Sequence, residues 1–174
     1  MKIALFISRK NQLSVDCCVE IINLLGAVND VSIDEGYKKY FSKDILSKLS
    51  FFDSSKKIDK SYDFLFSIGG DGTILRSITF IKDSGIPILG INTGRLGFLT
   101  GLQKESLKHG LKLLKNNDYR IVKRSTISVS SEKNNIDLKI NEKRKWIKLN
   151  LEDAIKSRTV GSFTNRKRVL GTMT

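Results

Sequence analysis

The sequence predicts an α/β fold: an open parallel sheet with helices on both faces, followed by only the start of a β-rich second domain. Short apolar runs that suit buried strands alternate with apolar residues at helical spacing up to about residue 117. Such alternation is typical of a parallel sheet covered by helices. Two of the apolar runs lead directly into glycine-rich stretches, as strands do at the ligand-binding edge of α/β sheets.

The first two expected elements are a strand and a helix. KIALFIS (2–8) is a short apolar run bounded by polar residues, which predicts a buried strand. SVDCCVEIINLLGA (14–27) follows with apolar residues at helical spacing. Ser14 and Gly26 are the expected N-cap and C-terminal stop of this helix.

The next segments continue the alternation. Residues 30–41 are compatible with a second strand, and residues 43–52 with a short helix. DFLFSI (63–68) is an apolar run that enters the first glycine stretch. Residues 74–85 then carry apolar side chains on one helical face, with Gly85 at the end.

The pattern repeats once more before it changes. IPILGIN (86–92) predicts another buried strand, and it enters the second glycine stretch. Residues 104–117 place leucines on one helical face, and 119–130 begin a strand of alternating character. From about residue 135 the chain is dense in Lys and Arg, and few apolar residues follow either period.

Three parts of the chain are expected from this change in texture. They are an α/β domain at 1–118, for which the glycine stretches described below imply nucleotide binding, a segment at 119–140 that the resemblance described below implies is the start of a β-rich second domain, and an atypical basic, partly helical tail at 141–174. The abrupt change and the end at Thr174 suggest a truncation or a shifted reading frame.

Length and charge narrow the class of protein. The chain has 174 residues, which suits one domain or one domain plus a fragment, and a formal net charge of +13. Its lysines are scattered along the predicted helices without interleaved aromatic residues, so we expect no specific nucleic-acid partner. No apolar run suits a membrane span or a signal peptide, so a cytoplasmic protein without a membrane partner is expected.

The cysteine and histidine residues do not indicate a disulfide, a metal site or a catalytic site. Cys17 and Cys18 are adjacent, which is poor geometry for a disulfide, and they are expected to be buried thiols. His109 is the single histidine and lies on a predicted amphipathic helix. No side chain is therefore assigned as a metal ligand.

The first glycine stretch, GGDGT (69–73), has the composition of a phosphate-binding loop. At the carboxyl end of a parallel strand a helix begins with free N–H groups and partial positive charge. Glycines there let the backbone approach a phosphate closely. We therefore expect Gly70 and Gly72 to lie against a phosphate.

Asp71 is the unusual residue of this stretch, because a carboxylate beside phosphates is repulsive unless it has a chemical task. Two tasks fit: holding a Mg²⁺ ion that bridges the phosphates, or accepting the proton of an attacking hydroxyl. A structural alternative is that Asp71 only caps the following helix. The residue pattern by itself leaves these possibilities open.

A second stretch, GINTGRLGF (90–98), also follows a predicted strand, which indicates one shared cleft for the two stretches. Neither GxxxxGK[ST] nor GxGxxG is present, so the usual P-loop and dinucleotide fingerprints are excluded. Arg76, one helical turn past Asp71, could reach a phosphate, although a lone arginine of this kind is more often solvated.

Together the two stretches resemble the NAD kinase family. IGGDGTILR (68–76) alone is shared with diacylglycerol, sphingosine and 6-phosphofructo-kinase relatives, whereas PILGINTGRLGFL (87–99) discriminates in favour of NAD kinases. The resemblance covers roughly residues 1–130. It implies the N-terminal fold of NAD kinases and phosphofructokinases, and an enzyme that transfers the γ-phosphate of ATP to the 2′-hydroxyl of the adenosine ribose of NAD.

The resemblance also implies roles for individual residues. Asp71 takes the position of the catalytic proton acceptor, and Mg²⁺ or another divalent cation accompanies ATP. Phe98 is expected near an adenine ring. The residues implied to contact nucleotides are Gly70, Asp71, Gly72, Thr73, Arg76, Asn92 and Phe98.

The chain departs from the family pattern after the second stretch. The family's Asn-Asp/Glu pair and TPTGSTAY-like stretch are absent, and LNLED (149–153) does not replace them. The resemblance therefore leaves open whether this chain is active, and it implies a homo-oligomer only for the intact family protein. The alternatives are a diacylglycerol- or sphingosine-type lipid kinase relative and a non-catalytic nucleotide- or RNA-binding remnant.

Overall fold

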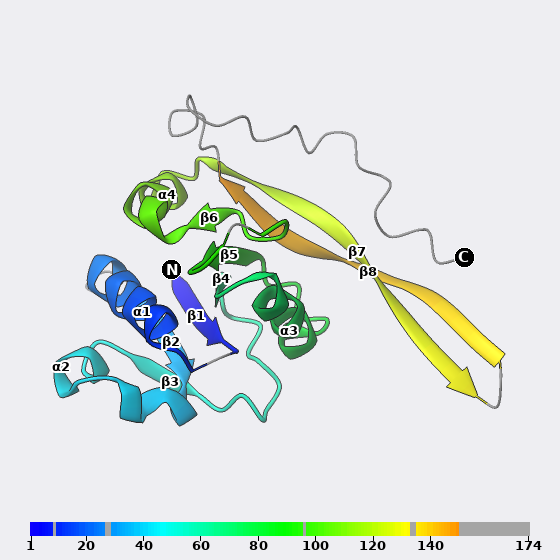
Figure 1. Ribbon diagram of the computed structural model, residues 1–174, viewed down its shortest axis with the longest axis horizontal. Coiled ribbons are helices and arrows are strands. Elements are labelled where there is room, and N and C mark those ends of the chain that lie inside the picture. The colour runs from blue at the N-terminus through cyan, green and yellow to red at the C-terminus, as the bar shows by residue number, and fades with distance from the viewer. Residues whose placement is uncertain (9, 27–28, 96, 133–134, 150–174) are drawn as a thin grey trace.

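The computed structural model describes residues 1–8, 10–26, 29–95, 97–132 and 135–149, with side chains described up to residue 124 (Figure 1). Its single sheet has the strand order β3-β2-β1-β4-β5-β8-β7, with β6 paired beside β5. The strands are β1 Lys2–Ile7, β2 Asp30–Asp34, β3 Ser50–Phe52, β4 Phe64–Ile68, β5 Ile88–Asn92, β6 Leu102–Gln103, β7 Tyr119–Glu132 and β8 Asn135–Leu149.

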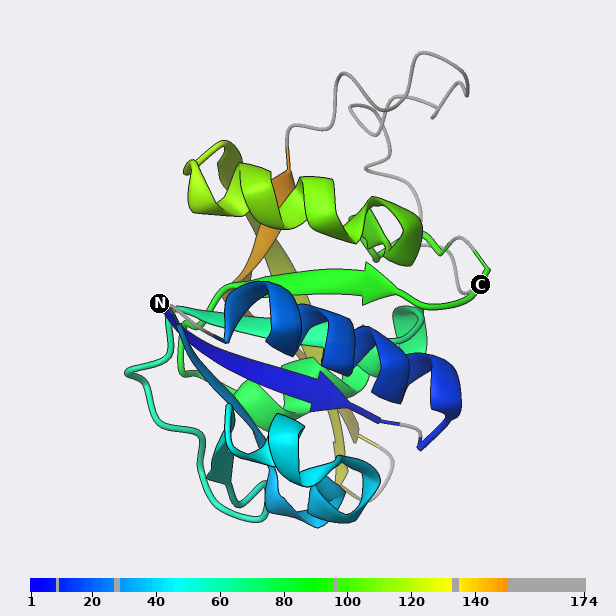
Figure 2. The same ribbon diagram turned by 90° about the vertical axis from the view of Figure 1, so that its left-hand side faces the viewer.

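The first six strands are parallel, as the alternating pattern predicts. The helices that connect and cover them are α1 Gln12–Leu25, α2 Lys43–Leu46, α3 Asp71–Ile81 and α4 Leu107–Lys115, with 3₁₀ turns at Glu35–Tyr40 and Lys104–Ser106. Figure 2 shows α1 and α4 on one face of the sheet, whereas α3 covers the other face in Figure 1. The predicted α/β class is confirmed.

Strand β1 shows why both faces need a helix layer. Its side chains alternate between the faces, so Ile3 and Leu5 pack with α1 and α4 in one apolar cluster. Ala4 belongs to the second cluster, which includes Ile81 at the end of α3. Because the strand is buried on both sides, it reads as a continuous apolar run.

Several elements differ in detail from the sequence-based expectation. Helix α1 begins earlier than expected, because Asn11 is the N-cap and its side chain accepts the N–H of Ser14 at 2.8 Å. Ser14 itself is buried inside the helix. Asn and Ser are equally good caps, so composition did not separate them.

Two strands were not expected, and a third extends beyond the segment that was expected to be β-rich. Strands β3 and β6 have only three and two residues, too few for a period of two to be visible. Residues 135–149 form β8, which pairs antiparallel with β7. Residues 135–140 lie in the segment that was expected to be β-rich, whereas residues 141–149 were expected to begin the partly helical tail, and that expectation is wrong. The division into parts at 118 and 140 stays a prediction, and residues 150–174 of the predicted tail lie outside the described residues.

In the part of the chain that the structure describes, none of the helices has both the length and the apolar character needed to cross a bilayer.

Candidate functional site

The sheet brings the two glycine stretches together. Strands β4 and β5 are neighbours, with Ser67 opposite Gly90 and Ile68 opposite Ile91. Immediately beyond the strands, the N–H of Gly69 donates to the carbonyl oxygen of Ile91 at 2.9 Å. Because the strands are parallel, both stretches leave the sheet at the same edge, which is where ligands bind in such folds.

The turn between β4 and α3 uses its glycines in two ways. Gly69 has φ +146°, and an added Cβ would overlap the hydroxyl of Thr73, so the turn itself requires glycine there. A Cβ on Gly70 or Gly72 would meet no atom within 4 Å. Gly70 is the N-cap of α3 and supplies no side-chain cap. The backbone N–H groups of the first helical turn therefore face open space, and such a position favours the binding of an anion.

Asp71 is the first residue of α3, and it does not cap that helix. Its Oδ2 accepts the N–H of Phe98 at 2.8 Å, and its Oδ1 accepts the N–H of Leu99 at 2.9 Å. An added Cβ on Gly97 would lie 2.7 Å from the Asp71 carboxyl carbon. The cap alternative is therefore wrong, and the carboxylate instead ties the start of α3 to the second glycine stretch.

Phe98 is the most conspicuous side chain on that stretch. The residue is 72% exposed although its backbone N–H donates to Asp71. Asn92, by contrast, is buried, and both ends of its amide are used inside the turn. Its Nδ2 donates to the Arg95 carbonyl at 2.7 Å, and its Oδ1 accepts the Gly94 N–H at 2.9 Å. Asn92 thus shapes the turn that carries Phe98.

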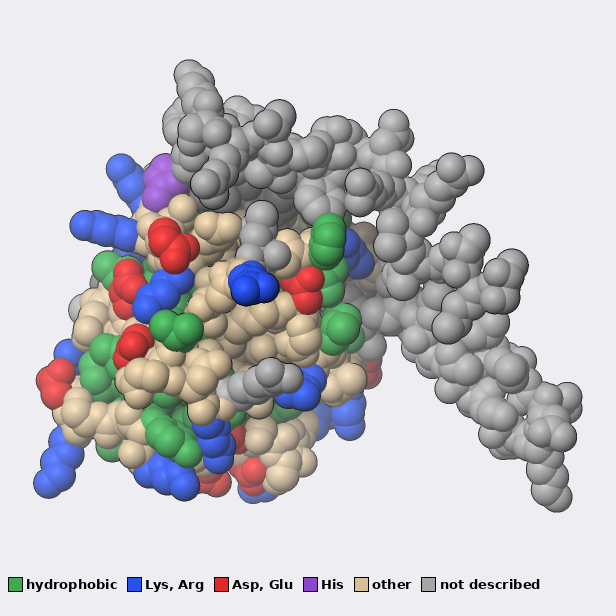
Figure 3. Space-filling view, in the orientation of Figure 1, with side chains coloured by type: hydrophobic (Ala, Val, Ile, Leu, Met, Phe, Trp, Pro, Cys, Tyr) green, Lys and Arg blue, Asp and Glu red, His purple; other side chains and the backbone are tan. Residues whose placement is uncertain are grey.

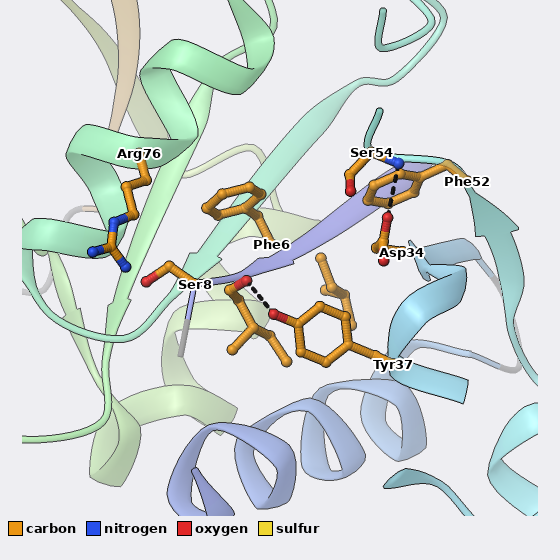
Figure 4. Close-up of a pocket in the computed structure, with 9 residues that line it drawn as sticks. Phe6, Ser8, Asp34, Tyr37, Phe52, Ser54 and Arg76 are labelled. Atoms are coloured by element: carbon orange, nitrogen blue, oxygen red, sulfur yellow. Dashed lines mark hydrogen bonds between the residues drawn. The ribbon is translucent and has the colours of Figure 1, made fainter. Parts of the chain in front are cut away.

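Thr73 and Arg76 point toward a different part of the site. The Thr73 hydroxyl lies 2.9 Å from the Ser8 hydroxyl at the end of β1, and Thr73 is buried. Arg76 is exposed and lines a pocket together with Ser8 (Figure 4). The predicted residues are therefore close in space, but they fall on two sides of the start of α3.

The pocket has a volume of about 260 Å³ and lies beyond the carboxyl ends of β1, β2 and β3. It is lined by Leu5, Phe6, Ile7, Ser8, Asp34, Tyr37, Phe52, Ser54 and Arg76. Apart from Arg76, the sequence reasoning did not single out these residues. Ser8 could have been found, because it is the first polar residue after the apolar strand β1. Asp34 ends β2, whose sequence DVSID is itself partly polar, so the sequence does not single it out.

Hydrogen bonds fix the polar wall of this pocket. Asp34 Oδ2 accepts the Ser54 N–H at 2.7 Å, and its Oδ1 accepts the Gly36 N–H at 2.8 Å. The Tyr37 hydroxyl donates to the Ile7 carbonyl at 2.7 Å. Burial, helped by the Asp34 charge, raises the pKa of Tyr37, which keeps this hydroxyl protonated and donating.

Charges on the molecular surface are mixed on the face seen in Figure 3, where Lys and Arg side chains alternate with acidic and apolar ones. No group of three or more His, Cys, Asp or Glu side chains that could hold a metal occurs within the described residues. Cys17 and Cys18 lie on the buried face of α1, and burial raises the pKa of Cys17 to about 12. Such thiols are protonated and unsuited to nucleophilic chemistry.

The comparisons with known proteins agree on one family. Residues 34–119 match the family model of the ATP-NAD kinase N-terminal domain. The NAD kinase of Flavobacterium psychrophilum is 38% identical over 125 residues, which is 71% of this chain and 42% of that protein. The NAD kinase of Flavobacterium johnsoniae is 38% identical over 117 residues, 67% of this chain and 40% of that protein.

A solved structure shows the same fold. The crystal structure of yeast NADH kinase complexed with NADH superimposes with a TM-score of 0.64 and 18% identity, covering 84% of this chain and 46% of that one. The chain thus spans about two fifths of the length of these two curated relatives.

Proposed function

Through its N-terminal domain this chain belongs to the NAD kinase family, and we propose that it supplies the phosphate-transfer half of an NAD kinase. The reaction moves the γ-phosphate of ATP to the 2′-hydroxyl of the adenosine ribose of NAD and gives NADP. The relatives named NAD kinase support this reaction, and the NADH in the yeast relative supports a nicotinamide dinucleotide as acceptor.

The observation that carries the proposal is the position of Asp71 at the open start of α3. Each carboxylate oxygen accepts one backbone N–H, so each keeps acceptor capacity for a further hydrogen bond. A ribose hydroxyl is a poor nucleophile at neutral pH, and a carboxylate at hydrogen-bond distance would accept its proton as the phosphate is transferred. General-base assistance of this kind contributes about 10²–10⁴-fold to a rate.

The other site residues take supporting roles in this proposal. Gly70 and Gly72 leave the first amides of α3 free for the transferred phosphate, and the helix dipole favours its charge. Thr73 and Arg76 border the path of the phosphates. Phe98 offers its exposed ring to the adenine of NAD, and Asn92 holds the turn below it.

A divalent cation fits this arrangement only as a partner of ATP. Mg²⁺ usually binds through one or two carboxylates together with substrate phosphates. Asp71 is the acidic residue in the first turn of α3, and it is already assigned as the proton acceptor. The phosphates of ATP, and not a side chain of this chain's described residues, would therefore supply the ligands of Mg²⁺. When bound, Mg²⁺ would neutralise charge on the β- and γ-phosphates.

The test is NADP formation by this chain from NAD and Mg-ATP, measured with an NADP-specific dehydrogenase. Asp71→Asn should abolish the activity, because an amide does not accept the proton. Asp83→Asn is the matched control, since Asp83 is exposed beyond the far end of α3 and pairs with Lys57. Full activity in the Asp71→Asn variant would refute the proposed role.

One observation favours a second candidate, a nucleotide-binding protein without turnover: the chain spans only about two fifths of its relatives. Calorimetry would then detect binding of ATP and NAD while no NADP forms. We also propose a cytoplasmic location, which suits the two free, buried cysteines.

A further inference from the structure

We propose that the hairpin of β7 and β8 binds the phosphate backbone of duplex DNA without reading its sequence. This binding is separate from phosphate transfer and does not depend on the proposed reaction. It concerns basic residues on both strands of the hairpin, none of which belongs to either glycine stretch.

The positive charge of the chain is concentrated in this hairpin. Residues 119–149 contain nine Lys or Arg and three Asp or Glu, whereas residues 1–118 contain seventeen and thirteen. The α/β part of the chain is therefore nearly balanced in charge for its length, while the short hairpin is strongly basic. A basic segment of this density attracts polyanions.

The strand register brings like charges together. Basic residues occupy directly opposite positions in three pairs, which are Arg120–Lys148, Lys123–Lys145 and Arg124–Arg144. The β7 members of these pairs are exposed. Like charges directly opposite each other destabilise an antiparallel pair of strands. Folding alone would therefore not favour this register, whereas an anionic ligand would neutralise the repulsion.

Protection of a sheet edge does not account for both members of the pairs. Charged residues, Lys above all, commonly prevent an edge strand from pairing with other chains. Strand β7 is an edge strand, so its cations could serve this purpose, but β8 lies between β5 and β7. Lys145 and Lys148 flank Trp146, which pairs with Ile88 of β5. The cations of β8 at this point therefore protect no edge, and binding of a ligand explains them better.

The spacing of the pairs suits a duplex. Arg120 and Arg124 are four residues apart on β7, so they share one face of the strand and lie about 13 Å apart along it. The major groove of B-DNA is about 12 Å wide. The first and third pairs are thus spaced to meet phosphates of both DNA strands.

A single strand suits the hairpin less well, because proteins that bind single strands stack the bases on aromatic side chains. Tyr119 is the aromatic residue of the hairpin whose side chain the structure describes. Its ring packs edge-on against Phe64, with centroids 5.8 Å apart, so it is already used inside the fold. The described part of the hairpin therefore favours contacts with phosphates over contacts with bases.

The experiment measures fluorescence anisotropy of a labelled DNA duplex of arbitrary sequence, titrated with the full chain at several NaCl concentrations. The double variant Lys145→Glu/Lys148→Glu places acids opposite two β7 cations, so two repulsive pairs become ion pairs. The matched control is Lys56→Glu/Lys57→Glu, which makes the same change in charge at two exposed lysines between β3 and β4. The ion pairs of these lysines are exposed and contribute little to stability.

The wild type should bind the duplex at low salt, and its affinity should fall steeply as the salt concentration rises. Each neutralised phosphate contributes about 0.9 to the slope of log affinity against log salt, so the hairpin variant should reduce this slope by about 2. Its thermal unfolding midpoint should stay the same or rise, because the repulsion is removed. The control should keep the slope of the wild type.

Unlabelled duplex should also compete better than a single strand of the same length or polyglutamate. The inference is overturned if the wild type does not bind the duplex at low salt, or if the two double variants lose binding equally. It is also overturned if the single strand or polyglutamate competes as well as the duplex, or if the hairpin variant unfolds at a lower temperature than the wild type. A chain that makes no NADP can still bind DNA, so this test and that of the proposed function fail independently.

Discussion

At the scale of single residues, Asp71 joins two tasks in one carboxylate. It is the proposed proton acceptor, and it also holds the Phe98 and Leu99 amides at 2.8 and 2.9 Å. A substitution at Asp71 therefore disturbs the loop as well as the chemistry. Variants of its neighbours separate the two effects better than variants of Asp71 itself.

Gly97→Ala should disturb the contact between the loop and Asp71 while the carboxylate itself is kept. An added Cβ would lie 2.7 Å from the Asp71 carboxyl carbon, so either the loop or the carboxylate must move. We expect a loss of about 1–3 kcal/mol in the free energy of unfolding, as for other overpacked sites, measured by urea denaturation. Trypsin should also cleave faster after the exposed Arg95.

Gly94→Ala is the control for this change, because its nearest neighbour would be Asn92 Oδ1 at 4.0 Å. Its stability should change by less than about 0.5 kcal/mol. Equal behaviour of the two variants would contradict the close contact between Gly97 and Asp71.

The residue types of the site could be predicted, but their partners could not. GGDGT follows a strand and precedes a helix, so a phosphate loop and a special role for Asp71 follow from local sequence. The hydrogen bonds of Asp71 to residues 98 and 99 join positions far apart in the chain, and nothing local encodes that pairing. The hydrogen bond that the Asn92 amide makes within its own turn could not be predicted for a different reason. An asparagine in a loop can either bind a ligand or stabilise a turn, so the residue type does not tell which role applies.

At the scale of elements, the first turn of helix α3 contains a residue that lowers the stability of the helix. Gly72 lies in that turn, and a Cβ there would meet no atom within 4 Å. Alanine is a far better helix former than glycine, by about 1 kcal/mol. Folding alone would therefore favour alanine, which points to a ligand that needs the space.

Gly72→Ala should accordingly act in opposite directions on folding and binding. The free energy of unfolding should rise by up to about 1 kcal/mol, while ATP binding weakens because the methyl group meets the phosphate. Urea denaturation and calorimetry measure the two quantities on the same sample. A variant that is more stable and binds ATP normally would show that the first turn does not contact the phosphates.

Whether a strand could be predicted from the sequence depended on its length and on the burial of its side chains. Strands β1, β4 and β5 could be predicted because burial on both faces makes them continuous apolar runs. Strand β3 is too short to carry a pattern, and its residues were assigned to the preceding helix. Strand β8 is rich in Lys and Arg, so hydrophobic periodicity did not reveal it.

At the scale of the whole molecule, the two thiols on the buried face of α1 show whether this helix stays packed on the sheet. Cys17 and Cys18 are fully buried, so Ellman's reagent at pH 8 should react with them only after unfolding in urea. Burial raises the pKa of Cys17 to about 12 in the folded state, whereas an unfolded thiol has a pKa of about 8.5. The folded pKa is the higher one, so the thiol's contribution to stability is complete below pH 8.5 and is lost as the pH rises toward 12.

Stability should therefore fall between pH 8.5 and 10.5, by up to about 1.4 kcal/mol per pH unit for Cys17. Urea denaturation at several pH values measures this slope. Cys17→Ala should reduce it without removing it, because burial also raises the pKa of Cys18. Rapid labelling of the native chain, or a slope unchanged in the Cys17→Ala variant, would contradict the burial of this thiol.

The predicted boundary at residue 118 can be tested by shortening the chain. Strands β7 and β8 pair mainly with each other, and they meet the rest of the sheet through the register pair Ile88 and Trp146. In Figure 1 their hairpin extends well beyond the other strands. A chain of residues 1–120 should therefore keep its far-UV circular dichroism per residue in the helical bands and unfold cooperatively.

A chain of residues 1–118 differs from it by Tyr119 and Arg120, and Tyr119 packs edge-on against Phe64 with ring centroids 5.8 Å apart. Losing this ring should cost about 1–2 kcal/mol in urea denaturation, because a partly buried aromatic contributes both area and ring contacts. If both chains fold and differ by this amount, the boundary lies just after Tyr119, and the ring belongs to the first domain. If neither folds, the β7–β8 hairpin is part of the first domain, because the sheet then depends on β8 to cover the edge of β5.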